Sequence, residues 1–136
     1  MANEEKIKET QAWLEKAKQD LKSAKWLLSS PEPLYNAVGF HSQQAAEKLL
    51  KAYLTWHDEP FEKTHSLVAL VGKCLQFDQD LQELRMASVT LTPFAVTFRY
   101  PGELPELTFD ANKAYVLAEE MWLFLIERFP KETHPE

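Results

Sequence analysis

The sequence is short of several residue types, and each shortage excludes a class of protein. It has one cysteine, Cys74, which rules out an internal disulfide and a cysteine-based metal cage. It has three glycines and no long polar low-complexity run, so a disordered chain is not expected. No stretch approaches the roughly 20 apolar residues needed to cross a bilayer, and the residues after Met1 are polar, unlike a secretory signal. We therefore expect a folded cytoplasmic protein without membrane contact.

Positive charge is also scarce. Lysine and arginine together number 15 against 21 aspartate and glutamate residues, and the formal net charge is −6. Proteins that coat nucleic acid through their whole surface are usually basic, so that class is excluded. A local basic site is still compatible with this composition.

The residues that are present fit one globular domain. The chain has 136 residues, of which 45% are hydrophobic and 12% aromatic, enough for a self-sufficient core. We expect a single domain over residues 1–136, with residues 130–136 as a frayed tail.

Apolar residues recur at helical spacing through most of the chain. The pattern predicts helices over about 4–28, from Pro33 to about 56, 65–76, from Asp78 or Asp80 to about 98 with a bend at Pro93, and 108–129. Hydroxyl side chains precede two of them, so Thr64 and Thr108 are the expected N-caps. No strand pattern occurs. The predicted fold is therefore all-α, an up-and-down antiparallel bundle of four to five helices.

The second predicted helix carries polar residues among mostly apolar ones. On a helical wheel, four of them form one narrow stripe with alanines beside it: His41, Gln44, Lys48 and Lys51. Because a mostly apolar helix is usually buried, the stripe indicates a cleft or interface that meets a polar, anionic partner. The alternative is a solvent-exposed stripe, in which Lys51 forms an ordinary i,i+4 ion pair with Glu47. Gly39, unfavourable inside a helix, indicates a close approach of another helix.

The least regular segment, residues 99–106, begins with Arg99 and Tyr100. Arginine offers a planar fork for phosphate and tyrosine a stacking face, so both are candidate ligand-binding residues. The alternative is a rigid turn in which Arg99 pairs with a carboxylate. His41 and His65 lack the spacing of a helical metal pair, and no metal or other cofactor is expected.

Several blocks of the sequence resemble the HEPN family. Residues 40–48 read Phe-His-Ser-Gln-Gln-Ala-Ala-Glu-Lys, and further matches are 64–67, 91–96 and 99–102, in the family's order. The resemblance implies a helical bundle that forms a homodimer and binds a nucleotide or RNA in a groove made by both protomers. It also implies a minimal nucleotidyltransferase as a possible partner, in a toxin–antitoxin pair or as its substrate-binding subunit.

The ribonuclease members of that family carry an arginine followed by histidine after four to six residues. Arg99 matches the arginine, but the positions for the histidine hold Leu104, Pro105 and Glu106. A second spacing match, Arg128 with His134, continues past Pro130 into the expected tail. The resemblance therefore favours binding over cleavage.

We predict a nucleotide- or RNA-end-binding module without catalytic residues. Two alternatives are a metal-independent ribonuclease toxin with a degenerate motif, in which His41 or His65 is the base, and a structural protein–protein adaptor. The candidate nucleotide-binding residues are His41, Gln44, Lys48, Lys51, Arg99 and Tyr100.

Overall fold

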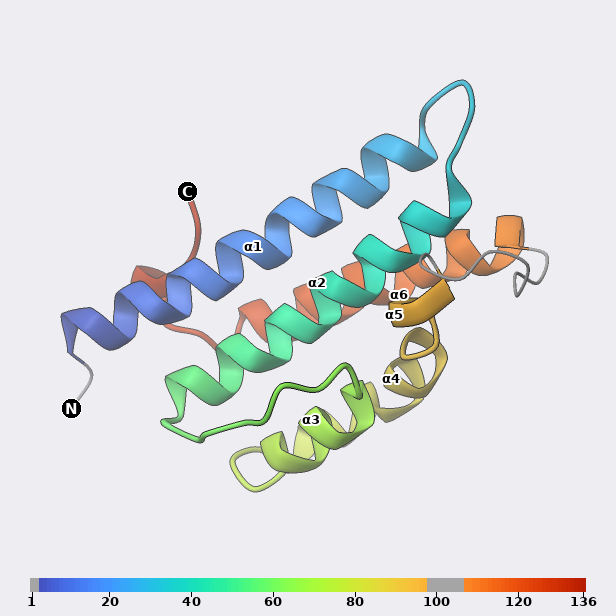
Figure 1. Cartoon of the computed structure of the whole chain (residues 1–136). Coiled ribbons are helices and arrows are strands. Elements are labelled where there is room, and N and C mark those ends of the chain that lie inside the picture. The colour runs from blue at the N-terminus through green and yellow to red at the C-terminus, as the bar shows by residue number, and fades with distance from the viewer. Residues whose placement is uncertain (1–2, 98–106) are drawn as a thin grey trace.

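Three long helices form the frame of the molecule (Figure 1). The computed structural model describes residues 3–97 and 107–136. Helices α1 (Glu4–Leu28) and α2 (Tyr35–Trp56) are antiparallel neighbours, and α6 (Leu107–Ile126) packs against α2 and also contacts α1. No strand occurs among the described residues. The all-α bundle predicted from the sequence is confirmed.

Helix α1 has the expected bounds because both of its ends are well specified. Asn3 is the N-cap, and its side-chain oxygen accepts a hydrogen bond from the Lys6 backbone N–H at 2.7 Å. Glu4 and Glu5 lie in the first turn and Lys25 in the last, where their charges favour the helix dipole. Between these two ends, the helix packs one mostly apolar face against α2.

Helix α2 is the centre of the core. Its fully buried residues contact α1, α6 and the short helices, and include Ala45, Ala46, Leu49, Leu50 and Leu54. Gly39 lies where α5 (Phe94–Thr97) crosses α2, and a Cβ at this position would overlap the Phe94 ring. The close approach that Gly39 predicted is therefore made within the chain, by α5.

The segment between α2 and α6 differs from the prediction. It folds as α3 (Leu67–Cys74), the 3-10 helix η1 (Gln79–Leu84), α4 (Arg85–Leu91) and α5. Ser66 caps α3 by accepting from Ala69 N–H at 3.2 Å, whereas the expected cap, Thr64, accepts from Ser66 N–H. The predicted cap Thr64 is wrong because its hydroxyl closes the preceding turn. Asp78 does open the next segment, which breaks before Phe94 as Pro93 predicted.

The two ends of α6 also correct the sequence analysis. The helix begins at Leu107, so Thr108 lies within it and is not its N-cap. The tail beyond Pro130, expected to be frayed, forms the 3-10 helix η2 (Lys131–Thr133) and packs on α1. Thr133 is fully buried, and the Gln11 amide donates to the His134 carbonyl at 3.0 Å. These contacts hold the tail against the bundle.

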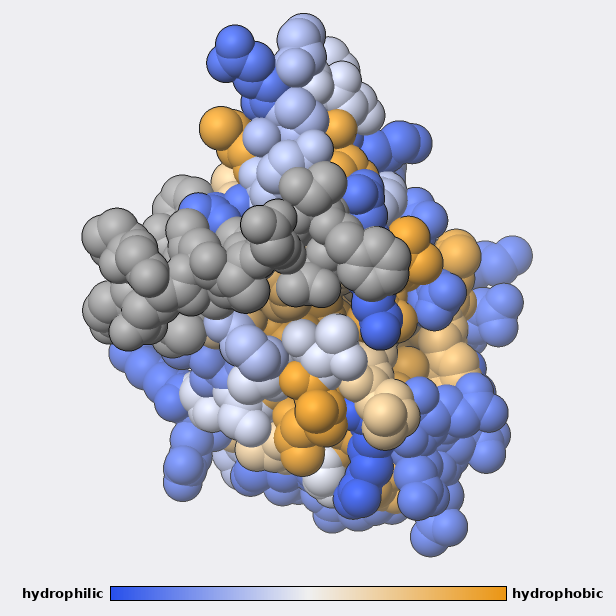
Figure 2. All heavy atoms as spheres, turned by 90° about the vertical axis from the view of Figure 1, so that its right-hand side faces the viewer, coloured by the Kyte–Doolittle hydropathy of each residue, from blue (hydrophilic) through white to orange (hydrophobic). Residues whose placement is uncertain are grey.

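Polar and apolar side chains both occur on the end of the molecule that carries the loop between α1 and α2 (Figure 2). Figure 2 shows apolar side chains in several separate patches among polar ones on one end of the molecule. The most exposed large apolar residues of the described chain are Trp26, Met86 and Leu123. No described helix is long and apolar enough to span a membrane.

Candidate functional site

A buried carboxylate joins α1 to α2. Asp20 of α1 is 8% exposed, and its two oxygens have different partners on α2. Its Oδ2 accepts from the Lys48 ammonium at 2.5 Å, and its Oδ1 lies 2.8 Å from Nδ1 of His41. A carboxylate in this position needs such partners because burial removes its hydration. We call these three residues the Asp20 cluster.

The Asp20 cluster fixes the orientation of the His41 ring. The carboxylate beside Nδ1 favours the tautomer with a proton on Nδ1, which makes Nε2 an acceptor when the ring is neutral. Nε2 has no hydrogen-bond partner among the described residues, and the side chain is 31% exposed. His41 is therefore an oriented, partly exposed ring with one nitrogen available for a further hydrogen bond, as in a ligand-binding or proton-transferring histidine.

A second cluster of the same composition surrounds Glu47. Oε2 of Glu47 accepts from the Lys51 ammonium at 2.9 Å, and Oε1 lies 2.9 Å from Nδ1 of His65. The Gln43 amide also donates to Oε1, at 3.1 Å. Burial alone raises the pKa of Glu47, but the hydrogen bonds from His65, Lys51 and Gln43 together bring it below its ordinary value. We call Glu47, Lys51 and His65 the Glu47 cluster.

Glu47 and Lys51 are less accessible than Asp20 and Lys48, whereas the His65 side chain is more exposed than that of His41, at 52% against 31%. Lys51 is 8% exposed, and its ammonium lies 5.8 Å from the centre of the Trp13 ring and 5.7 Å from that of Phe61. The i,i+4 pair of Glu47 with Lys51 is confirmed, but the exposed stripe that this pair was expected to form is wrong. Aromatic rings cover the ammonium, so Lys51 belongs to the interior of the bundle.

The four predicted residues of α2 therefore separate into two environments. His41, Gln44 and Lys48 lie on the partly exposed part of the helix, and Lys51 lies in the buried Glu47 cluster. Gln44 donates to the Gln43 side chain at 2.8 Å, which connects the exposed stripe to the buried amide. The stripe is not a row of free cations, because each lysine has a carboxylate partner.

Arg99 and Tyr100 lie outside the described residues. The last element described before them is α5, which packs on α2 at Gly39, two residues from His41. Arg128 and His134, the other spacing match to the ribonuclease motif, are both engaged in the fold. Arg128 binds Asp78 at 3.0 Å, and the His134 Nε2 lies 3.1 Å from the Phe129 carbonyl oxygen.

The sequence analysis missed two residues that organise the site, Asp20 and Gln43, and gave Glu47 only as the ion-pair partner of Lys51. Asp20 had a detectable signal, because it lies beside the apolar seam of α1 that includes Ala17 and Ala24. An acidic residue on a buried seam needs a cationic partner. Within the described part of the chain, no group of three histidine, cysteine or acidic residues is arranged to hold a metal ion.

Comparisons with known proteins agree with this architecture. The sequence matches the HEPN domain over residues 10–129. The structure is similar to the crystal structure of TT1696 from Thermus thermophilus, with a TM-score of 0.77 and 27% identity, covering 88% of this chain and 98% of that one. The search of curated proteins gave no match. Since the family match spans nearly all helices of the bundle, the chain belongs to the HEPN domain family.

Proposed function

We propose that this HEPN protein binds a nucleotide, or the nucleotide end of an RNA, at the Asp20 cluster and does not cleave it. The observation that carries the proposal is that the Asp20 cluster holds an oriented histidine and a lysine that are both partly exposed, His41 and Lys48. The Glu47 cluster orients His65 in the same way, but its lysine is buried beside aromatic rings, so among the described residues it lacks an accessible cation next to its histidine. The partly exposed pair in the Asp20 cluster supports a ligand-binding role.

Each residue of the cluster has a distinct part in this proposal. The Nε2 of His41 and the Gln44 amide supply directional hydrogen bonds to a base or ribose. The ammonium of Lys48 has three donors, of which Asp20 takes one, and the side chain is 23% exposed. Its remaining donors bind phosphate. Lys51 is excluded from direct contact by its burial, and Arg99 and Tyr100 are proposed to complete the phosphate and stacking contacts.

The assembly state is part of the same proposal. HEPN proteins generally dimerise, and we propose that two copies of this chain form the groove, with a minimal nucleotidyltransferase as the protein partner. An acidic surface, with net charge −6, repels bulk nucleic acid and restricts binding to a local site. Sedimentation equilibrium of the purified chain tests the homodimer directly.

Calorimetric titration with ATP, GTP and their monophosphates tests nucleotide binding. His41→Ala is expected to weaken binding at least about fivefold, the loss of one hydrogen bond to a partly buried group. His65→Ala is the matched control, because it removes the histidine of the other cluster and leaves the Asp20 cluster intact. Equal loss in both variants, or no heat with any nucleotide, contradicts the proposal and favours the protein–protein adaptor.

A second candidate function is metal-independent RNA cleavage. It is favoured by one observation, that a carboxylate orients His41 as a general base is oriented in hydrolytic sites. Incubation with single-stranded RNA in excess EDTA tests it. Cleavage that His41→Ala abolishes and His65→Ala retains supports this candidate. Intact RNA at high protein concentration excludes it.

A further inference from the structure

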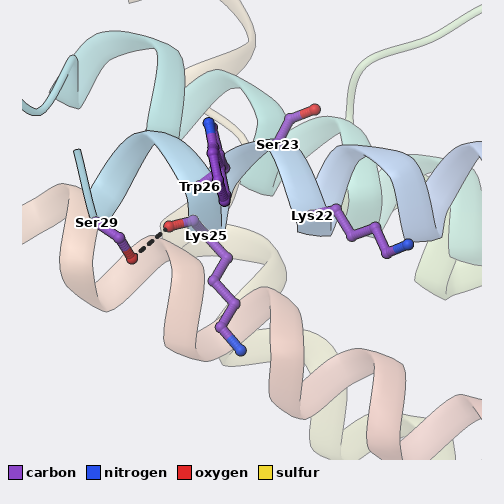
Figure 3. A pocket seen from close by; sticks show the side chains of 5 residues that line it. All are labelled: Lys22, Ser23, Lys25, Trp26 and Ser29. Carbon is purple, nitrogen blue, oxygen red and sulfur yellow. Dashed lines mark hydrogen bonds between the residues drawn. The ribbon is translucent and has the colours of Figure 1, made fainter.

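A second surface with ligand-binding character lies at the carboxyl-terminal end of α1. Five side chains line a hollow of about 680 Å³ there: Lys22, Ser23, Lys25, Trp26 and Ser29. We call this surface the Trp26 face. Figure 3 shows its side chains projecting from one stretch of α1, with Lys25 extending toward α6. Lys22 and Lys25 also line an adjacent groove of about 510 Å³ between α1 and α6.

Trp26 is the most exposed large hydrophobic residue of the described chain, at 80%. It has no ring or cation partner among the described residues, whereas Trp13 packs on Phe61 and Trp56 is covered by Lys6. A tryptophan is normally largely buried because its ring has a large apolar area. The exposed indole of Trp26 therefore indicates a surface that a binding partner covers.

The lysines of the Trp26 face are unpaired as well. Four other lysines of the described chain lie near a carboxylate: Lys6, Lys48, Lys51 and Lys73. The ammonium groups of Lys22 and Lys25 have no such partner among the described residues. The acidic side chain that shares their groove, Glu119, accepts from the Tyr115 hydroxyl. Two neighbouring lysines without a direct ion pair, on a protein of net charge −6, are a local anion-attracting feature.

The chemistry of the face matches single-stranded nucleic acid better than a protein helix. A helix-binding groove needs an apolar floor for residues spaced three and four apart. The Trp26 face instead combines one aromatic ring with two ammonium groups and two hydroxyls, from the last turns of α1 and its C-cap. Successive bases of a single strand stack on exposed aromatic rings, while lysines neutralise the neighbouring phosphates.

We propose that the Trp26 face binds single-stranded nucleic acid, with a base stacked on Trp26 and phosphates on Lys22 and Lys25. At about 100° per residue, the side chains of Lys22, Lys25 and Trp26 leave α1 roughly 160°, 140° and 120° away from that of Asp20, so the three proposed contacts point away from it. The Trp26 face is thus separate from the Asp20 cluster. The proposal adds a polymer-binding surface to the proposed nucleotide site. Either binding activity can be present without the other, so each is tested separately.

Fluorescence anisotropy of a 5′-fluorescein-labelled 12-nucleotide oligouridylate, titrated with the full-length protein at low salt, tests the proposal. Trp26→Ala is expected to weaken binding on the order of tenfold, the loss of one stacked base. Lys22→Gln/Lys25→Gln is expected to reduce the slope of log affinity against log salt by about 1.4, from two phosphate contacts. A 12-base-pair duplex is expected to bind more weakly than the single strand, because its bases are already stacked.

The matched control is Lys8→Gln/Lys63→Gln, which removes two exposed lysines outside the Trp26 face. Oligonucleotide affinity that falls in the face variants and persists in the control supports the proposal. Equal affinities in all variants overturn it, as does the absence of binding to the wild-type protein. Calorimetry with mononucleotides separates the two sites, because the face variants are expected to retain that heat.

Discussion

At the residue scale, the two clusters contain the same three kinds of side chain, a carboxylate, a lysine and a histidine, but differ in how exposed the lysine is. Both place a histidine and a lysine on the two oxygens of one acidic side chain. In the Asp20 cluster the lysine side chain is 23% exposed, whereas in the Glu47 cluster it is 10% exposed and covered by rings. Burial of the lysine therefore separates a structural cluster from one that can exchange partners with a ligand.

Breaking the Glu47 cluster is expected to destabilise the fold. Glu47→Leu leaves the Lys51 ammonium buried without a carboxylate, and removing one partner of a buried ion pair costs about 3–5 kcal/mol. Adding Lys51→Met removes the orphaned charge, so the double variant is expected to recover most of that loss. Urea unfolding followed by circular dichroism measures both free energies.

An exposed pair is the control for this prediction. Glu59 and Lys73 lie 4.0 Å apart at the surface, so Glu59→Gln is expected to change stability by less than about 1 kcal/mol. A double variant at positions 47 and 51 that is no more stable than Glu47→Leu alone would show that the clustered charges are not coupled.

Local spacing predicted some of these residues and could not predict others. The Glu47–Lys51 pair lies within one helix, so its geometry follows from the sequence positions alone. Asp20 and Lys48 are 28 positions apart, and their contact depends on the register of α1 against α2. That register is set by packing of many side chains, and a single sequence carries no direct signal for it.

At the element scale, the long helices were predictable and the short ones were not. Helix α1 has an unambiguous cap and a long apolar seam, so its predicted bounds agree with the structure. Between residues 57 and 97 the chain offers several capping side chains close together, including Thr64, Ser66 and Asp78. Which of them begins a helix is decided by tertiary contacts. In this segment the predicted helix boundaries therefore differ from the observed ones, and one predicted helix corresponds to η1, α4 and α5.

The crossing of α5 over α2 gives a prediction with a built-in control. Gly39→Ala is expected to destabilise the protein by about 1–3 kcal/mol, because the new methyl group overlaps the Phe94 ring in a packed interior. In contrast, Gly72 of α3 is exposed, with nothing within 4 Å of a Cβ at its position. Gly72→Ala is expected to stabilise by about 0.5–1 kcal/mol through helix propensity.

Chemical denaturation midpoints of the two variants compare them directly. If both alanines stabilise the protein equally, then α5 does not pack closely on α2. Adding Phe94→Leu to Gly39→Ala makes room for the methyl group, and we expect it to restore part of the lost stability.

At the scale of the whole molecule, the end of α2 joins the core to the segment that follows α3. The His57 ring lies between two aromatic rings, 4.4 Å from Tyr53 and 4.5 Å from Phe77, centre to centre. Burial, with a smaller contribution from Lys6, lowers the pKa of His57 below its ordinary value of 6.5, although Asp58 and Asp78 oppose the shift. The folded protein therefore favours the neutral imidazole at this junction.

This lowered pKa predicts how stability depends on pH. As the pH falls below about 6.5, the unfolded chain binds a proton at His57 before the folded protein does, so unfolding becomes more favourable. The loss continues until the pH reaches the folded pKa. Glu47 acts in a separate window, because its lowered pKa gives stability that is lost only below its ordinary value of 4.5.

Replacing His57 by phenylalanine isolates its contribution, because the aromatic ring retains the contacts with Tyr53 and Phe77 while the proton-binding group is removed. Urea midpoints measured between pH 5 and 8 are expected to fall less steeply toward acid in His57→Phe than in the wild-type protein. Parallel pH profiles would contradict the assignment.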